Sequence, residues 1–396
     1  MSAIRVLYSF PHRIGAGRIC STAYHQVCGL AGAGSSVTVL SGSAAKALPP
    51  GVRLLKTLAL GDLRVPARIV GRGTTCAVHD WVTAKWLQRN GGNIDVVHCW
   101  PLASIRTLRV AKQLGIPTFI ERPNTHTAYA YEAAAEENRL LGVALPGNHD
   151  HEFNGTYLAK EEEEYEAADY LLCPSEFVAR TFFDRGYTGE KIRRHHYGYD
   201  PARFLPGSQD AYEDRGLVML YAGVCEPRKG LHYALDAWLS STAHRRGKFI
   251  VCGDFVPGYR EKLAERLSHP SIEFLGHRSD LPELMAKADV FALSSVEEGS
   301  ALVTYEARAA GCVLLVSDGS GAVCQHGHDA LVHPMRDVAA LTKHLDQVDS
   351  DRAFLSKLRA ASLSTIGGID WAGAGTCLAR LYSESIEARH PAPLSA

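Results

Sequence analysis

Two glutamates, Glu298 and Glu306, stand eight positions apart on either side of a turn of small residues. The turn follows the apolar segment 289–295 and opens into a helix-like run that ends at Gly311. Because open α/β sheets bind ligands at the carboxyl ends of their strands, we expect both carboxylates to border a ligand site. Free N–H groups at the helix start attract phosphate, and carboxylates accept hydrogen bonds from hydroxyls. This combination indicates a nucleotide sugar.

A structural interpretation of the same spacing stays open, because a glutamate before a helix is often a solvated cap and one inside a helix often faces water.

A second segment favours the ligand site. The apolar strand 217–222 leads into a turn with Arg228, Lys229 and Gly230, and apolar residues then recur at helical spacing. Two cations at the end of a strand could form charge-assisted hydrogen bonds to a diphosphate, although adjacent cations in turns are more often solvated.

Taken together, these segments resemble the family 4 (group 1) retaining glycosyltransferases of the GT-B fold. In the second half the resemblance covers 228–230, 272–277, 281–289, 298–311, 317–321 and 327–334. In the first half it covers 95–98, 114–117, 168–175 and 197–204. The resemblance implies an α/β protein with two Rossmann-like domains facing a central cleft. It also implies transfer of a hexose or related sugar from a nucleotide-diphosphate sugar to a hydroxyl of a glycan, lipid or small molecule.

The resemblance assigns roles to residues of the second half. Glu298 would contact hydroxyls of the donor sugar and Glu306 the ribose, while Arg228 and Lys229 would stabilise charge on the departing phosphate. The backbone N–H groups that would meet the diphosphate belong to Gly299, Ser300, Ala301, Leu302 and Val303. Base recognition would involve the loops near His277 and Arg278, and the donor would be a UDP-, GDP- or ADP-linked sugar.

The first half offers two further candidates. His126 follows the strand 117–121 and would face the active site, although a lone loop histidine is usually polar surface. Gly17 follows the first strand, where a glycine lets backbone approach a ligand closely. A GxGxxG fingerprint is incomplete because position 20 is Cys20, so a dinucleotide site is not favoured. The resemblance implies instead that the loop with Gly17 lies near the donor phosphates, which would make Gly17 a donor contact, or near the acceptor across the cleft.

A metal is not expected to take part. No Asp-x-Asp motif accompanies the phosphate turn, and fixed cations can stabilise a leaving diphosphate, so we predict metal-independent transfer without a cofactor. His149 and His151 look like a metal pair, but no third ligand stands at suitable spacing, and a solvated loop is expected. The arginine that the family usually places after the strand-end glycine is replaced by Val224, which leaves Arg228 as the nearby guanidinium.

Strand and helix patterns alternate along both halves of the chain, which is typical of doubly wound sheets. We expect an N-terminal Rossmann-like acceptor domain at 1–205 and a C-terminal Rossmann-like donor domain at 206–375, with a linker around 201–216. By resemblance, a final helix at 376–396 would pack back on the first domain.

Composition limits the partners and the location. A formal net charge of −1 argues against nucleic acid, which calls for a basic surface. Because no apolar run reaches the length of a membrane span and the first strand begins almost at once, a cytoplasmic location is expected. Arg64, Arg68 and Arg72 could contact an anionic membrane if helical, but Pro66 and Gly71 favour a solvated loop. The ten cysteines lack CxxC pairs and are expected to be free thiols.

Two alternatives belong to other functional classes. A phosphorylase-like enzyme would share the fold but would need a lysine carrying pyridoxal phosphate, which no segment marks. A catalytically silent nucleotide-sugar-binding or scaffold protein is suggested by the substitution at Val224.

Overall fold

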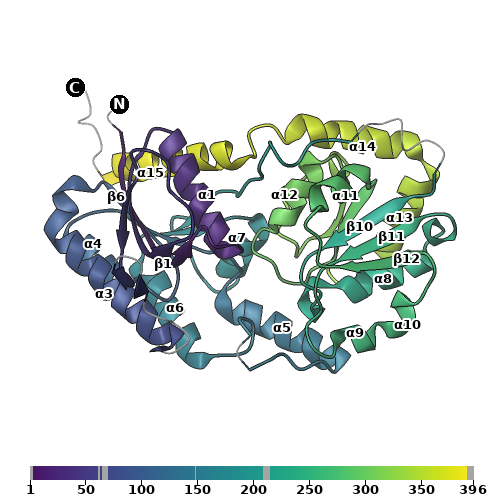
Figure 1. Cartoon of the computed structure of the whole chain (residues 1–396), viewed down its shortest axis with the longest axis horizontal. Helices are drawn as coiled ribbons and strands as arrows, with labels where there is room; N and C mark the ends of the chain where they lie inside the picture. The colour runs from purple at the N-terminus through teal and green to yellow at the C-terminus, as the bar shows by residue number, and fades with distance from the viewer. Residues whose placement is uncertain (1–2, 61–62, 65–69, 148, 208–214, 390–396) are drawn as a thin grey trace.

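The computed structural model describes residues 3–60, 63–64, 70–147, 149–207 and 215–389 (Figure 1). These residues form two α/β domains side by side, each built on a parallel sheet. The α/β fold with two Rossmann-like domains that the sequence predicts is therefore confirmed.

The first sheet has seven strands in the order β3-β2-β1-β6-β7-β8-β9. Every neighbouring pair is parallel. The strands are β1 (Arg5–Ile14), β2 (Ser36–Ala44), β3 (Arg53–Lys56), β6 (Val96–Cys99), β7 (Thr118–Glu121), β8 (Tyr170–Cys173) and β9 (Ile192–Arg194). Strands β6 and β7 are buried along their whole length, as expected for parallel strands covered by helices on both faces. A separate antiparallel pair joins β4 (Ala59–Leu60) to β5 (Leu63–Arg64).

The helices of this half are α1 (Ile19–Gly32), α3 (Arg72–Asn90), η1 (Gly91–Asn93), α4 (Ile105–Gln113), α5 (Thr127–Leu141), α6 (Gly155–Ala167) and α7 (Glu176–Phe183). Helix α5 extends from the first domain to the second (Figure 1). There Glu137 of α5 is buried and accepts hydrogen bonds from Tyr233 Oη at 2.9 Å and Arg336 Nε at 2.6 Å. This helix therefore fixes the two domains against each other.

The second sheet has six strands in the order β12-β11-β10-β13-β14-β15. They are β10 (Val218–Ala222), β11 (Lys248–Cys252), β12 (Ile272–Gly276), β13 (Val290–Leu293), β14 (Val313–Ser317) and β15 (Ala330–His333). The chain order reverses between the neighbours β10 and β13, and open sheets bind ligands at such switch points. The segments that follow these two strands thus meet at one place.

The helices of the second half surround that sheet. They are η3 (Pro227–Lys229), α8 (Leu231–Ser240), η4 (Ala243–Arg245), α9 (Tyr259–Lys262), α10 (Ala264–Leu267), α11 (Leu281–Lys287), α12 (Leu302–Ala309), α13 (Val338–Ser350), α14 (Arg352–Thr365) and α15 (Trp371–Arg389). The core of this domain is a single apolar cluster centred on the buried strands β10, β13 and β14.

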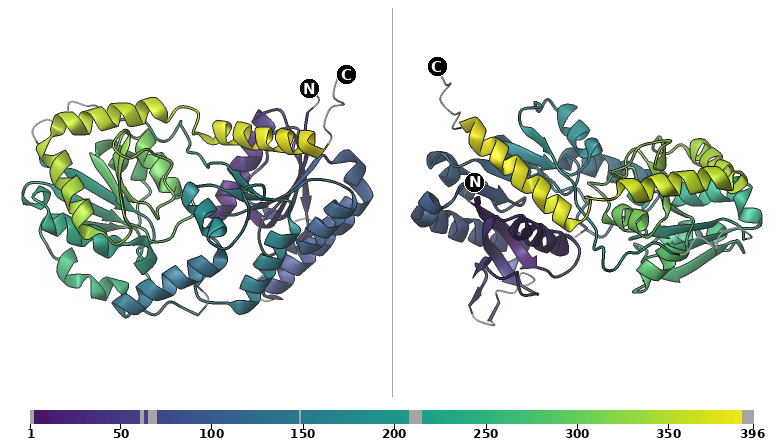
Figure 2. Two further views of the ribbon diagram at one scale, coloured as in Figure 1. Left: turned by 180° about the vertical axis from the view of Figure 1, so that it is seen from behind. Right: turned by 90° about the horizontal axis from the view of Figure 1, so that it is seen from above.

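Helix α15 leaves the second domain and lies along the first, beside α1 (Figure 2). Leu378, Leu381 and Tyr382 pack into the same apolar cluster as β1. A Cβ on Gly29 would lie 2.4 Å from the backbone oxygen of Trp371, so the two helices pack backbone to backbone. The domain boundaries proposed from sequence remain a prediction. Residues 208–214 of the expected linker and 390–396 of the expected final helix lie outside the described residues.

Other sequence expectations concern the surface and the thiols. No helix of the described residues is both long and apolar enough to span a membrane. Arg68 lies outside the described residues, whereas Arg72 begins α3 and pairs with Asp150 at 2.7 Å. All ten cysteines are free thiols, as predicted.

Replacing Leu378 by alanine tests the packing of α15. Leu378 is fully buried, so Leu378→Ala should lower the free energy of unfolding by about 2–5 kcal/mol through lost burial and a residual cavity. Arg380→Ala on the same helix is the control, because that side chain is 60% exposed, and it should change stability by no more than about 0.5 kcal/mol. Urea unfolding measures both, and equal midpoints would contradict the packing.

Candidate functional site

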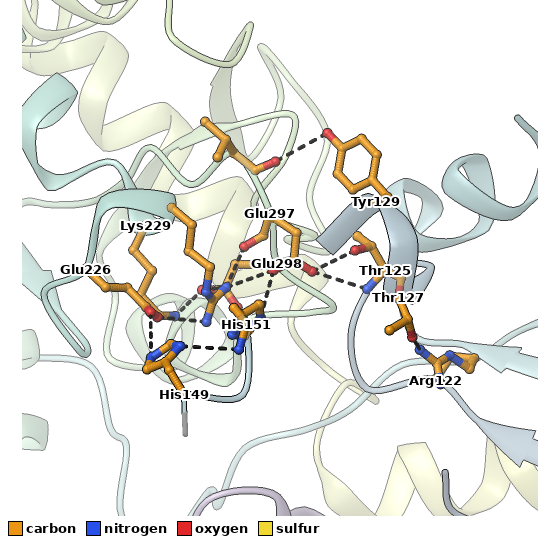
Figure 3. A network of polar contacts seen from close by, with 12 residues as sticks. Arg122, Thr125, Thr127, Tyr129, His149, His151, Glu226, Lys229, Glu297 and Glu298 are labelled. Atoms are coloured by element: carbon orange, nitrogen blue, oxygen red, sulfur yellow. Dashed lines mark hydrogen bonds and ion pairs between the residues drawn. The ribbon is translucent and has the colours of Figure 1, made fainter. Parts of the chain in front are cut away.

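Five charged side chains gather where the segments after β10 and β13 meet (Figure 3). We name them the charge cluster; its members are Glu226, Arg228, Lys229, Glu297 and Glu298. Glu226 directly precedes η3, and Arg228 and Lys229 belong to it. Glu297 and Glu298 belong to the loop between β13 and α12. The topology of the sheet thus joins residues about seventy positions apart.

Arg228 lies at the centre of the charge cluster and is buried. Its Nη2 lies 2.8 Å from Oε1 of Glu226, and its Nη1 lies 3.0 Å from Oε2 of Glu297. The same Nη1 donates a hydrogen bond of 2.7 Å to the backbone oxygen of Glu297. Burial alone would lower the pKa of Arg228, but the surrounding carboxylates outweigh it and raise that pKa. Arg228 is therefore a fixed positive charge that holds the two loops together.

Lys229 forms an ion pair with Glu298. The Lys229 side chain is 16% exposed, whereas the side chains of Glu298 and Arg228 are both 10% exposed, so Lys229 lies nearest the surface of the three. Gly230 follows with φ +66°, and a Cβ there would lie 1.9 Å from the backbone oxygen of Ser294. Glycine at this position lets the loops after the two strands touch.

The first domain also reaches the charge cluster. Thr125 donates a hydrogen bond of 2.7 Å from Oγ1 to Oε1 of Glu297. His151 Nε2 lies 3.3 Å from Oε2 of Glu297, and His149 Nε2 lies 3.3 Å from Oε2 of Glu226. Burial alone would raise the pKa of Glu297, but His151 and the charge of Arg228 outweigh it and lower that pKa to about 2. Glu297 is consequently ionised while both domains surround it.

The turn before α12 is pressed against the first domain. A Cβ on Gly299 would lie 1.7 Å from the backbone oxygen of Pro123, and Ser175 donates a hydrogen bond to the backbone oxygen of Gly299. Ser300 Oγ lies 2.6 Å from Tyr305 Oη. No side chain caps α12, which begins after Ala301, so its first N–H groups are available to a ligand.

Glu306 lies half-buried within α12. Burial raises the pKa of its carboxyl to about 7, against the opposing charge of Arg203. At neutral pH this carboxyl is therefore poised between its protonated and ionised forms.

Known proteins resemble the chain in sequence and in fold. Residues 216–351 match the family model described as Glycosyl transferases group 1. A D-inositol 3-phosphate glycosyltransferase of Catenulispora acidiphila is 26% identical over 388 residues, which cover 89% of this chain and 87% of that protein. The sucrose-phosphate synthase of Thermosynechococcus elongatus superposes with a TM-score of 0.69 at 17% identity, over 98% of this chain and 100% of that one. Anabaena HepE, solved with UDP, superposes with a TM-score of 0.66 at 15% identity, over 96% of this chain and 100% of that one.

The protein is a glycosyltransferase. Its fold is the GT-B fold of these structures, and the matched family segment contains the whole charge cluster, Glu306 and the turn before α12. The sequence resemblance to group 1 glycosyltransferases is thereby supported in the second domain.

Not every predicted site residue of the glycosyltransferase joins the charge cluster. His126 is 2% exposed and caps α5, where its Nδ1 accepts a hydrogen bond of 3.2 Å from the N–H of Ala128. Burial, with the charges of Arg122 and Arg185, lowers the pKa of His126 to about 3. His126 is thus a neutral capping residue in this structure, packed against Tyr165, Phe182 and Tyr187, and its expected place at the active site stays a prediction.

Three further candidates lie at the surface. Gly17 is exposed in the turn between β1 and α1 with φ +84°, and a Cβ there would meet open space. His277 and Arg278 are exposed after β12, and Arg278 forms a bidentate pair with Asp280 at 2.8 and 2.5 Å. Val224 occupies the expected arginine position and is 38% exposed.

Sequence reasoning missed several members of the glycosyltransferase site. Glu297 stands beside Glu298 and could have been noticed as a second acidic residue at a strand end. Glu226 and Thr125 carried no local signal, because their partners are distant in sequence. The expectation that His149 and His151 lack a third ligand is wrong, because Glu226 lies beside them.

A pH series on Glu306→Gln tests the environment of that carboxyl. Since its folded pKa of about 7 exceeds the ordinary 4.5, ionisation destabilises the folded glycosyltransferase increasingly between pH 4.5 and 7. Glutamine removes this penalty, so the free energy of unfolding at pH 8 should rise on the order of 2–3 kcal/mol, and most of the gain should vanish toward pH 5. Exposed Glu283→Gln is the control. A gain that is absent, or that is equal at both pH values, would refute the assignment.

Proposed function

We propose that this glycosyltransferase moves a hexose or related sugar from a nucleotide-diphosphate sugar to a hydroxyl of an acceptor, with retention of anomeric configuration and without a metal in the chemical step. The observation that carries the proposal is the Lys229–Glu298 ion pair at the sheet's switch point, beside the uncapped start of α12. A cation, a hydroxyl acceptor and free N–H groups together suit a sugar diphosphate.

Donor binding would exchange the partner of Lys229. A diphosphate carries more negative charge than the carboxylate of Glu298 and offers several oxygens to the ammonium group. Once Lys229 turns to the phosphate, Glu298 is released and accepts hydrogen bonds from hydroxyls of the donor sugar. The ion pair of the free protein therefore keeps both groups in place until the donor arrives.

Arg228 has a different role in this proposal. Both of its terminal nitrogens are already engaged by Glu226 and Glu297, and the side chain is buried. It positions Lys229 and Glu298 rather than contacting the leaving group. Lys229 is thus the residue that stabilises charge on the departing diphosphate.

The remaining donor contacts follow from α12 and the strand ends. Glu306 would hold the ribose, and the backbone N–H groups of 299–303 would meet the diphosphate at the start of α12. His277 and Arg278 would border the base. The domain containing 206–375 is then the donor side and the domain containing 1–205 the acceptor side.

The chemistry needs no enzymic base. The bond from the anomeric carbon to the phosphate oxygen breaks, and the bond to the acceptor oxygen forms on the same face of the sugar. The departing phosphate oxygen takes the proton of the acceptor hydroxyl. UDP-linked sugars are the first donors to test, because Anabaena HepE was solved with UDP and with UDP-glucose, and GDP- and ADP-linked sugars follow.

Substitution of Lys229 tests this role. Lys229→Met should reduce release of the nucleoside diphosphate from the donor sugar by about 10²–10³-fold, because a positioned donor to the developing charge is lost. Lys229→Arg should keep the charge and retain more activity than the methionine variant. Nucleotide release is followed over a panel of UDP-, GDP- and ADP-sugars with chelator present.

Controls separate chemistry from folding. Exposed Lys287→Met should leave turnover unchanged, and the melting temperature of Lys229→Arg should remain near that of the wild type. Full turnover in Lys229→Met would remove Lys229 from the reaction. A product of inverted anomeric configuration, observed by NMR, would instead overturn the proposal of retention.

A further inference from the structure

The loop between α5 and α6 brings two histidines to the edge of the charge cluster (Figure 3). His149 and His151 of the first domain, together with Glu226 of the second, each offer one ligand atom, and these atoms lie within 4.8 Å of one another. We propose that these three residues form a binding site for a divalent transition metal, with Zn²⁺ as the best fit. The proposal concerns metal binding between the domains, and it does not depend on the proposed sugar transfer.

The first support is an unsatisfied nitrogen. His151 is 9% exposed, and its Nε2 has no hydrogen-bond partner among the described residues. This atom lies 3.3 Å from Oε2 of Glu297, within ion-pair distance but outside hydrogen-bond geometry. Because a buried polar nitrogen that makes no hydrogen bond is costly, a bound cation would satisfy this atom.

The second support is the local charge balance. Among the described residues, the three carboxylates of Glu226, Glu297 and Glu298 form ion pairs with two permanent cations, Arg228 and Lys229, and lie beside the imidazoles of His149 and His151. One negative charge therefore remains in a site that is largely removed from water. A cation held beside Glu226 would compensate it.

The ligand types select the metal. Two imidazole nitrogens and one carboxylate oxygen suit Zn²⁺, which leaves a fourth position for water, whereas Mg²⁺ and Ca²⁺ prefer oxygen ligands. Zn²⁺ binds imidazole nitrogen at about 2.0–2.1 Å, so the three ligand atoms would draw closer together. The backbone N–H of His151 donates to Nδ1 of His149 at 3.2 Å. Coordination through Nε2 of His149 would place the ring proton on Nδ1 and so break this hydrogen bond.

The position of the site indicates what a metal would do. The loop from the first domain packs Val143 into the apolar core of the second domain, and its His149–Glu226 and His151–Glu297 pairs lie at the charge cluster. Metal bonds are stronger than such pairs, and bound metal stabilises the arrangement that contains its ligands. The metal would fasten this loop across the domain interface without contributing to the transfer step.

The test uses the full chain without a polyhistidine tag, freed of metal with chelator and then dialysed. Zn²⁺ is titrated by calorimetry, and Co²⁺ is followed by its visible absorption as a probe of ligand geometry. We expect one Zn²⁺ per chain, a tetrahedral Co²⁺ spectrum and a higher melting temperature with Zn²⁺. Mg²⁺ should produce no shift.

The His149→Ala/His151→Ala double variant should abolish stoichiometric Zn²⁺ binding and the accompanying rise in melting temperature. Exposed His328→Ala is the matched control and should bind like the wild type. An unchanged Zn²⁺ affinity in the double variant, or no Zn²⁺ binding by the wild type, would overturn the site. Nucleotide binding is measured separately in chelator. A failure to bind Zn²⁺ therefore leaves the proposed transfer intact, and a failure to bind nucleotide leaves the proposed metal site intact.

Discussion

The structure of the active region depends on the need to compensate buried charge. Arg228 is buried together with Glu226 and Glu297. Each of these charges would carry a large desolvation penalty if it were buried without its partners. The partners come from two different loops, and Thr125 and His151 of the other domain complete the shell of Glu297. Contacts between the domains therefore stabilise the ionised carboxylate of Glu297, and that carboxylate in turn holds the two domains together.

The sheet topology explains why the charges meet at this place. Parallel strands direct their carboxyl ends to one edge, and the chain order reverses between β10 and β13, which is where open sheets bind ligands. Gly230 and Gly299 allow the backbone to approach Ser294 and Pro123 closely, because a side chain at either glycine would collide with the backbone oxygen of that neighbour. Lys229 has the most exposed side chain of the charge cluster, at 16%, and its partner Glu298 lies beside it.

The sequence could predict the parts of the site that depend on local order. The two-domain α/β fold followed from alternating strand and helix patterns, and Lys229 and Glu298 were found because each follows an apolar strand directly. The contacts of Glu297 with His151 could not be predicted, since they join residues 146 positions apart across a domain interface. The capping role of His126 could not be predicted either, because a histidine at a strand end can face a ligand or cap the next helix, and its burial is visible only in the fold.

If the charge cluster exchanges an internal carboxylate for a donor diphosphate, calorimetric titration with UDP, GDP and ADP in the presence of chelator should reveal the exchange. One nucleoside diphosphate should bind with a stoichiometry of one per chain. Its affinity should rise in Glu298→Gln, where Lys229 no longer has an anionic partner to give up. Absence of binding by all three diphosphates, or weaker binding in Glu298→Gln with the fold intact, would contradict the account.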